Sequence, residues 1–166
     1  MDLRGTRFGN LEFTEQEVLE LPEGLVGLPK LKRFLILDLA EQAPFRWLQS
    51  LDEPAVGFLI AEPGLFDPTY SLALDDHDLR GLAVRSATEL TVFVLCTRRG
   101  AWSATTGNLL GPVVVHTETR RGRQLIVEDA GYSTHAPLHQ VAKEAAGGRQ
   151  FAAHAGAEPI LRESGV

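Results

Sequence analysis

The apolar residues of this 166-residue chain alternate with polar ones in short runs, with a period of two that is typical of β-strands. Turn-forming residues separate the runs at spacings that fit an antiparallel barrel or sandwich. The pattern predicts an all-β, mainly antiparallel fold: a single β-barrel-like domain with one or two short helical turns. The strand candidates are Arg33–Leu39, Phe45–Leu51, Val56–Glu62, Tyr70–Leu74, Leu90–Thr97 (expected to be central), Val113–Thr117 and Gln124–Val127.

Local signals predict the connections between these strands. Gly9–Asn10 has the composition of a two-residue hairpin turn. Thr14–Glu17 has the spacing of a capping box, which favours one helical turn. Asp75 is a candidate cap for a brief helix over Asp76–Leu82. A charged hairpin tip is expected at Arg120–Arg123.

The character of the chain changes after Leu138. The segment that follows is dominated by Ala and Gly with scattered charge, and it lacks strand alternation. Gly147–Gly148 would interrupt any helix there. We therefore expect one β domain over residues 1–138 and a C-terminal tail over residues 139–166 that is a flexible appendage or a weak helix.

Composition and charge narrow the function classes. The net charge is −6 with a pI near 5.3. This sign argues against direct nucleic-acid binding and favours a basic protein partner. No run of apolar residues is long enough to cross a membrane, and the first residues do not resemble a signal peptide. Cys96 is the single cysteine, so no internal disulfide is expected and it should be a small buried hydrophobe. The chain is expected in the cytoplasm.

Histidines offer the main candidates for metal or catalytic chemistry. His135 and His139 are four residues apart, but Pro137 between them argues against a shared helix face. His116 lies in a predicted strand and is expected to face solvent or a partner. No nucleophile elbow is present, so we expect no enzyme, cofactor or metal. A small β-barrel enzyme or metal-binding protein that uses these three histidines is one alternative function, and an adaptor protein is another.

Large apolar residues in predicted loops are the more informative feature. Leu25, Val26 and Leu28 lie in one such loop. Side chains of this kind either pack beneath the loop or form a contact patch. Several loops together could build an apolar interface with a polar rim. The candidate protein-binding residues are Leu65, Phe66, Asp67, Tyr70, Asn108, Leu109 and Leu110.

Four blocks of the chain follow one another in a characteristic order: Leu21–Leu28, Pro44–Leu51, Asn108–Val115 and Gly122–Val127 with Tyr132–Thr134. In these blocks the chain resembles the flagellar assembly factor FliW family of bacteria. The first block is similar to that family's loop of the form Phe/Leu-Pro-x-Gly-Leu-x-Gly-Phe/Leu. Together they cover residues from about 6 to 138, and the tail lies outside the likeness.

The resemblance implies a non-enzymatic regulator with a β-barrel-like fold. FliW-like proteins bind the RNA-binding translational repressor CsrA and relieve its repression of flagellin synthesis. They also bind flagellin, which titrates them away from CsrA. The expected partners are therefore a CsrA-type regulator and flagellin, with no nucleic acid or membrane, and a monomer when unbound.

Some residues depart from the family pattern. Gly107 and Gly111 stand where the family usually has Ala, and Val26 replaces the usual Pro. His135 stands where the family usually has Arg after the Tyr-Ser-Thr block. The loss of that planar, bidentate donor removes any ion pair that it made.

Overall fold

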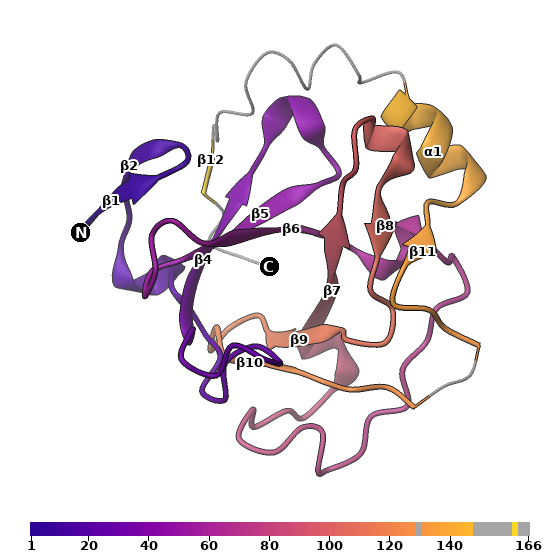
Figure 1. The fold of residues 1–166 in the computed structure, drawn as a ribbon. Helices are drawn as coiled ribbons and strands as arrows, with labels where there is room; N and C mark the ends of the chain where they lie inside the picture. The colour runs from indigo at the N-terminus through magenta and orange to yellow at the C-terminus, as the bar shows by residue number, and fades with distance from the viewer. Residues whose placement is uncertain (129–130, 148–160, 163–166) are drawn as a thin grey trace.

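A computed structural model describes residues 1–128, 131–147 and 161–162 of the chain. Within these ranges, a 10-stranded sheet forms the body and a 2-stranded hairpin lies at the N-terminus (Figure 1). The strand pairs of both sheets are antiparallel. The all-β, mainly antiparallel prediction is confirmed.

The elements follow one another as short strands joined by turns and 3-10 helices. The hairpin consists of β1 (Asp2–Thr6) and β2 (Gly9–Glu12). The sheet contains β3 (Leu19–Glu20), β4 (Arg33–Asp38), β5 (Arg46–Ser50), β6 (Gly57–Ala61), β7 (Leu90–Thr97), β8 (Thr106–Gly107), β9 (Val113–His116), β10 (Gly122–Gln124), β11 (Ala136–Pro137) and β12 (Leu161–Arg162). The helices are η1 (Glu15–Glu17), η2 (Ala40–Gln42), η3 (Pro63–Leu65), η4 (Ala87–Glu89), η5 (Trp102–Ala104) and α1 (Gln140–Gly147).

The strands are ordered β10-β9-β7-β6-β5-β4-β12 across the sheet. β3 also pairs with β4, and β8 lies between β7 and β11. β7 contacts three strands, because its first half pairs with β9 and its second half pairs with β6 and β8. The predicted central position of Leu90–Thr97 is therefore confirmed.

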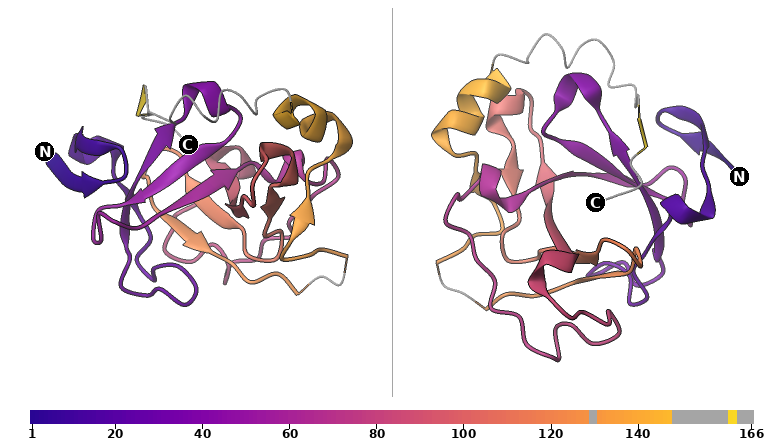
Figure 2. Two further views of the ribbon diagram at one scale, coloured as in Figure 1. Left: turned by 45° about the horizontal axis from the view of Figure 1, so that its top comes forward. Right: turned by 180° about the vertical axis from the view of Figure 1, so that it is seen from behind.

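The sheet curls on itself without closing into a continuous barrel (Figures 1 and 2). Among the described residues, an isolated parallel bridge between Glu20 and Arg121 joins the two ends of the curl. The Glu20 amide donates a 2.8 Å hydrogen bond to the Arg120 carbonyl at this point. The fold is thus barrel-like, with a gap where a closed barrel would carry a full ladder of hydrogen bonds.

Both faces of the sheet are buried, because consecutive strand residues point to opposite sides. On β7, Phe93 belongs to the core inside the curl, whereas its neighbour Val94 belongs to a second apolar cluster outside it. On β4, Phe34 faces the inner core and Leu35 faces a third cluster beneath the N-terminal hairpin. This two-sided burial explains why β4 and β7 are nearly continuous in apolar character.

The turn of the N-terminal hairpin lies at Arg7–Phe8, so its predicted place at Gly9–Asn10 is wrong. The Thr6 hydroxyl accepts a 3.1 Å bond from the Phe8 amide and donates a 2.6 Å bond to the Gly9 carbonyl. The Phe8 ring then packs edge-on against Trp47, with centroids 5.7 Å apart. The hydroxyl and this tertiary contact outweigh the local turn signal.

The predicted hairpin tip at Arg120–Arg123 is also wrong, since the chain turns over residues 117–119. Arg120 is buried, and its guanidinium donates a 2.8 Å bond to the Glu17 carbonyl. Arg123 forms a 2.9 Å ion pair with Glu23. These contacts place the arginines within the body of the protein, where they hold the β9–β10 connection to the N-terminal segment.

The segment after η3 is irregular, so the strand at Tyr70–Leu74 and the helix at Asp76–Leu82 are not formed. A single helical turn closes where the Leu79 amide donates to the Asp75 carbonyl at 3.1 Å. Gly81 follows with a φ of +78°, which ends the turn. The capping box at Thr14–Glu17, in contrast, is confirmed and starts η1.

Two elements of the structure lie in the Ala/Gly-rich tail. α1 packs beside η5, and β12 pairs with the edge of β4 (Figure 1). The prediction of a flexible tail falls largely on residues 148–160 and 163–166, which lie outside the described residues. Over the described ranges, no helix combines the length and apolar character needed to cross a membrane.

Candidate protein-interaction site

The first candidate loop begins with η3, whose Pro63 occupies the first helical turn. The Phe66 amide closes the turn on the Pro63 carbonyl at 3.0 Å, and the Phe66 side chain enters the second apolar cluster. Gly107 on β8 lies directly under this ring, because a Cβ there would stand 2.6 Å from Phe66 Cε2. The glycine found at position 107 thus makes room for the buried ring.

A tyrosine joins this loop to the second one. The Tyr70 hydroxyl donates a 2.8 Å hydrogen bond to the Leu109 carbonyl. Its ring lies against the ring of Tyr132, with centroids 4.6 Å apart, and the Tyr132 hydroxyl accepts a 3.1 Å bond from the Ser71 amide. Segments distant in sequence are therefore fixed against each other through aromatic rings with polar tips.

The second loop is a corner that leaves β8 at Asn108. The Asn108 amide donates to the Leu95 carbonyl at 2.9 Å, which ties the corner to β7. The Asn108 side-chain oxygen accepts a 3.1 Å bond from the Leu110 amide, which turns the chain. The Leu109 amide donates to the Ser133 carbonyl at 2.9 Å. The corner is held by hydrogen bonds on both sides.

The second apolar cluster contains four of the seven predicted binding residues: Leu65, Phe66, Tyr70 and Leu109. The seven residues differ in exposure. Phe66 and Leu109 are buried, with 7% and 3% of their surface exposed. Asp67 accepts bonds from the hydroxyl and amide of Thr69, and these bonds lower the pKa of its carboxyl. The five that remain partly exposed are Leu65, Asp67, Tyr70, Asn108 and Leu110.

The loop over residues 24–29 contributes apolar surface that the predicted set did not include. Leu25 is anchored in the inner core, whereas Val26 and Leu28 are 58% and 40% exposed. The Leu25 and Leu28 amides bond to each other's carbonyls, so Val26 and Gly27 form a tight tip. Of these three apolar residues, Leu25 packs beneath the loop, whereas Val26 and Leu28 form exposed apolar surface.

Gln124 on β10 connects this tip to the corner. Its side-chain oxygen accepts a 2.7 Å bond from the Val26 amide, and its side-chain nitrogen donates a 2.9 Å bond to the Gly111 carbonyl. Ile126, two residues further on, is 72% exposed. Gln124 therefore links the tip to the corner, and Tyr70 links the corner to the first loop. We call the partly exposed members of this set the interaction surface: Val26, Leu28, Leu65, Asp67, Tyr70, Asn108, Leu110 and Ile126.

The histidines are placed away from any common centre. His116 is buried, which corrects the expectation that it faces solvent. Its Nδ1 accepts bonds from the amides of Glu118 and Thr119, and its Nε2 lies 3.5 Å from a Glu89 oxygen. The His135 ring contacts the hydroxyl of its neighbour Thr134. Among residues 1–128, 131–147 and 161–162, no group of three or more His, Cys, Asp and Glu side chains could hold a metal ion.

Cys96 occupies β7 beside the second apolar cluster and is half-buried. Its Sγ donates a weak hydrogen bond to the Val94 carbonyl at 3.5 Å. Burial raises the pKa of the thiol far above its usual range, so the thiolate form is suppressed. The side chain therefore acts as a small apolar group, as its strand position predicts.

The β domain described above matches known proteins along most of its length. The family model "FliW protein" matches residues 2–138. A flagellar assembly factor FliW from Magnetococcus marinus is 40% identical over 139 residues, which are 83% of this chain and 85% of that one. A flagellar assembly factor FliW from Caldanaerobacter subterraneus subsp. tengcongensis is 33% identical over 146 residues, covering 87% and 97% of the two chains.

The fold agrees with that of a solved relative. The crystal structure of a flagellar assembly factor FliW superimposes with a TM-score of 0.77 at 31% identity, over 83% of this chain and 96% of that one. FliW proteins form a family of assembly factors rather than a known enzyme family. The chain belongs to the FliW family of flagellar assembly factors.

Proposed function

We propose that this protein binds a CsrA-type translational regulator and flagellin, and that it relieves repression of flagellin translation by sequestering the regulator in the cytoplasm. The observation that carries this proposal is the family match along the whole β domain, residues 2–138. Flagellin competes for the protein in this scheme, so flagellin that accumulates before export frees the regulator and stops further synthesis.

Charge supports the proposed regulator as a partner. The chain carries a net charge of −6, and a regulator that binds RNA needs a basic surface. Opposite charge steers two proteins together and raises the association rate, most strongly at low salt. An acidic protein does not compete for the RNA itself, so the proposed action is on the regulator.

The interaction surface supports protein binding at the linked loops. Val26, Leu28 and Ile126 expose large apolar side chains, which an interface can bury as its centre. Asp67 and Asn108 are partly exposed polar residues of the linked loops and would supply a polar rim. Phe66 and Leu109 belong to the same proposed site, where they support the exposed residues from beneath.

The proposal is tested by calorimetric titration of the full chain with the host's CsrA-type regulator and, separately, with its flagellin. We expect binding at micromolar concentrations or tighter to each protein. The absence of binding to both partners at these concentrations would overturn the proposed function.

Substitutions at the surface locate the interface. Leu110→Ala and Ile126→Ala are expected to weaken binding of at least one partner about tenfold, the effect of losing one buried apolar contact of roughly 1–2 kcal/mol. The matched control is Leu74→Ala, which removes a half-buried leucine outside the surface. Equal affinities for all three variants and the unmodified chain would place the interface elsewhere.

A further inference from the structure

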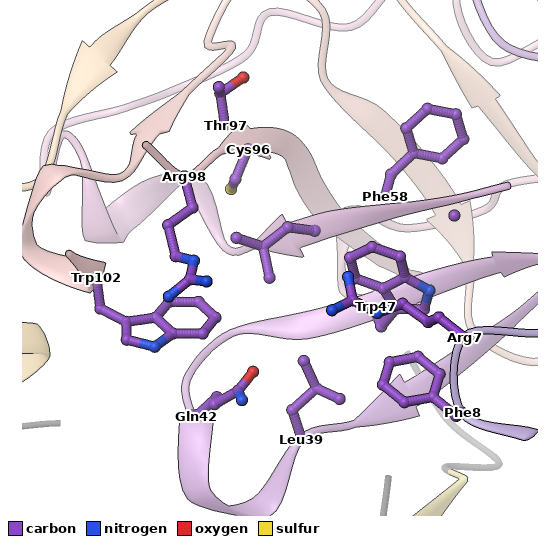
Figure 3. Close-up of a pocket in the computed structure, with 12 residues that line it drawn as sticks. Arg7, Phe8, Leu39, Gln42, Trp47, Phe58, Cys96, Thr97, Arg98 and Trp102 are labelled. Atoms are coloured by element: carbon purple, nitrogen blue, oxygen red, sulfur yellow. The ribbon is translucent and has the colours of Figure 1, made fainter. Parts of the chain in front are cut away.

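An open hollow of about 500 Å³ lies outside the interaction surface, where β6 and β7 separate. The register between these strands ends at the pair Leu59–Cys96, and the hollow begins at that pair (Figure 3). Its walls come from the N-terminal hairpin, η2, β5 and η5. Segments from six parts of the chain therefore converge on one cavity.

Aromatic rings form the opposite walls of this hollow. Trp102 forms one wall and is held by stacking on Phe45, with ring centroids 5.1 Å apart. Trp47 forms the other wall, with Phe8 edge-on beside it. Gly57 lets the Trp47 indole lie close against β6, because a Cβ at this position would collide with the indole. The walls are thus fixed before any ligand arrives.

Each indole carries an arginine at the rim. The Arg98 guanidinium lies 4.4 Å from the Trp102 ring, and the Arg7 guanidinium lies 4.6 Å from the Trp47 ring. Figure 3 shows the two guanidinium groups on opposite sides of the hollow. Within the described part of the chain, neither of them forms an ion pair or a hydrogen bond. No Asp or Glu is among the twelve lining residues, although the chain as a whole is acidic.

The Gln42 side chain adds a further hydrogen-bonding group to the walls. Gln42 is 2% exposed, and Figure 3 shows its side-chain amide turned toward the hollow. Two arginines and an amide suit a ligand that brings acceptor oxygens and negative charge.

We propose that this hollow binds an acidic segment of a partner protein in which two carboxylates flank an aromatic side chain. The aromatic group would lie between the indoles, and each carboxylate would pair with one arginine. The separation of the arginines on opposite sides favours an extended chain, because alternate residues of an extended chain point to the same side. This inference stands apart from the regulator and flagellin of the proposed function.

The test uses acetylated and amidated pentapeptides as probes. Asp-Gly-Phe-Gly-Asp places both carboxylates and the ring on one side, Asn-Gly-Phe-Gly-Asn removes the charge, and Asp-Gly-Gly-Gly-Asp removes the ring. Trp47 and Trp102 are the two tryptophans of the chain and both line the hollow. Intrinsic tryptophan fluorescence therefore reports occupancy directly, and calorimetry gives the affinity.

We expect the charged aromatic peptide to bind and shift the tryptophan emission, and each of its two analogues to bind at least about tenfold more weakly. Arg7→Gln with Arg98→Gln should weaken binding about 100-fold, since each charged hydrogen bond accounts for about tenfold or more. The matched control, Arg4→Gln with Arg85→Gln, removes the same charge from exposed positions that do not line the hollow and should keep the affinity.

Three results would overturn the inference. The first is the absence of any fluorescence change or heat with the charged aromatic peptide at millimolar concentration. The second is equal affinity of the two doubly substituted proteins, with melting temperatures showing that both are folded. The third is equal binding of phenylacetate and the peptide, which would point to a small-molecule site instead of a docking site.

Discussion

Replacing Phe66 with alanine is expected to lower the free energy of unfolding by about 3–5 kcal/mol, the range for a buried phenylalanine. The ring is 7% exposed and packs in the second apolar cluster over Gly107. Its removal leaves a cavity that β8 cannot fill without shifting. Urea unfolding followed by circular dichroism measures the change.

Leu65→Ala is the control for this experiment. Leu65 is the preceding residue and is only half-buried, so its truncation should cost about 1 kcal/mol. If Phe66→Ala changes stability no more than Leu65→Ala and instead removes partner binding, Phe66 is a direct contact residue. That outcome would contradict the buried placement of the ring.

Replacing Gly24 with alanine is expected to cost about 2–5 kcal/mol and to displace the tip that presents Val26. Gly24 has a φ of +71°, a conformation that costs an L-residue about 1–2 kcal/mol. A Cβ would also stand 2.7 Å from the Leu28 carbonyl oxygen and from Pro29 Cα, both of them backbone atoms. Because backbone atoms cannot rotate away, the clash adds about 1–3 kcal/mol. Denaturant unfolding gives the loss.

Gly27→Ala separates the cost of the positive φ from the cost of the steric clash. Gly27 has a similar φ of +79°, but a Cβ there meets nothing within 4 Å. Its substitution should therefore cost only the backbone term of about 1–2 kcal/mol. Equal losses for the two variants would mean that the contact between Gly24 and the Leu28–Pro29 backbone is absent in solution.

Features that depend on neighbours in sequence could be predicted from the sequence. The capping box at Thr14–Glu17 closes within one turn, and a long apolar run predicts β7. The strands β4, β5 and β6 lie within the predicted ranges because each is a short run rich in apolar residues. In each case the signal lies within the few residues that form the element.

Features that depend on distant contacts could not be predicted. The Arg7–Phe8 turn is selected by the packing of Phe8 on Trp47, which is about 40 residues away. Arg120 is drawn into the body by the carbonyl of Glu17, and Tyr70 is fixed by the carbonyl of Leu109. A local sequence pattern does not identify partners that are this distant in the sequence.

The candidate site shows the same limit. The sequence shows that large apolar residues lie in loops, but it does not state which of two neighbours is buried. Leu25 packs inside while Val26 is exposed, because the tip places adjacent side chains on opposite sides. Likewise, Leu109 is buried and Leu110 is half-exposed. The reason for a glycine at position 107 is the Phe66 ring, which occupies the space that a Cβ would need.

In the proposed function, the regulator and flagellin compete for this protein. Competition can be measured by titrating flagellin into a preformed complex with the host's CsrA-type regulator and separating the products by size-exclusion chromatography. We expect flagellin to displace the regulator in a concentration-dependent manner, so that a complex with flagellin replaces the first one. A stable complex containing all three proteins, or a regulator that stays bound at saturating flagellin, would show that the two partners do not compete.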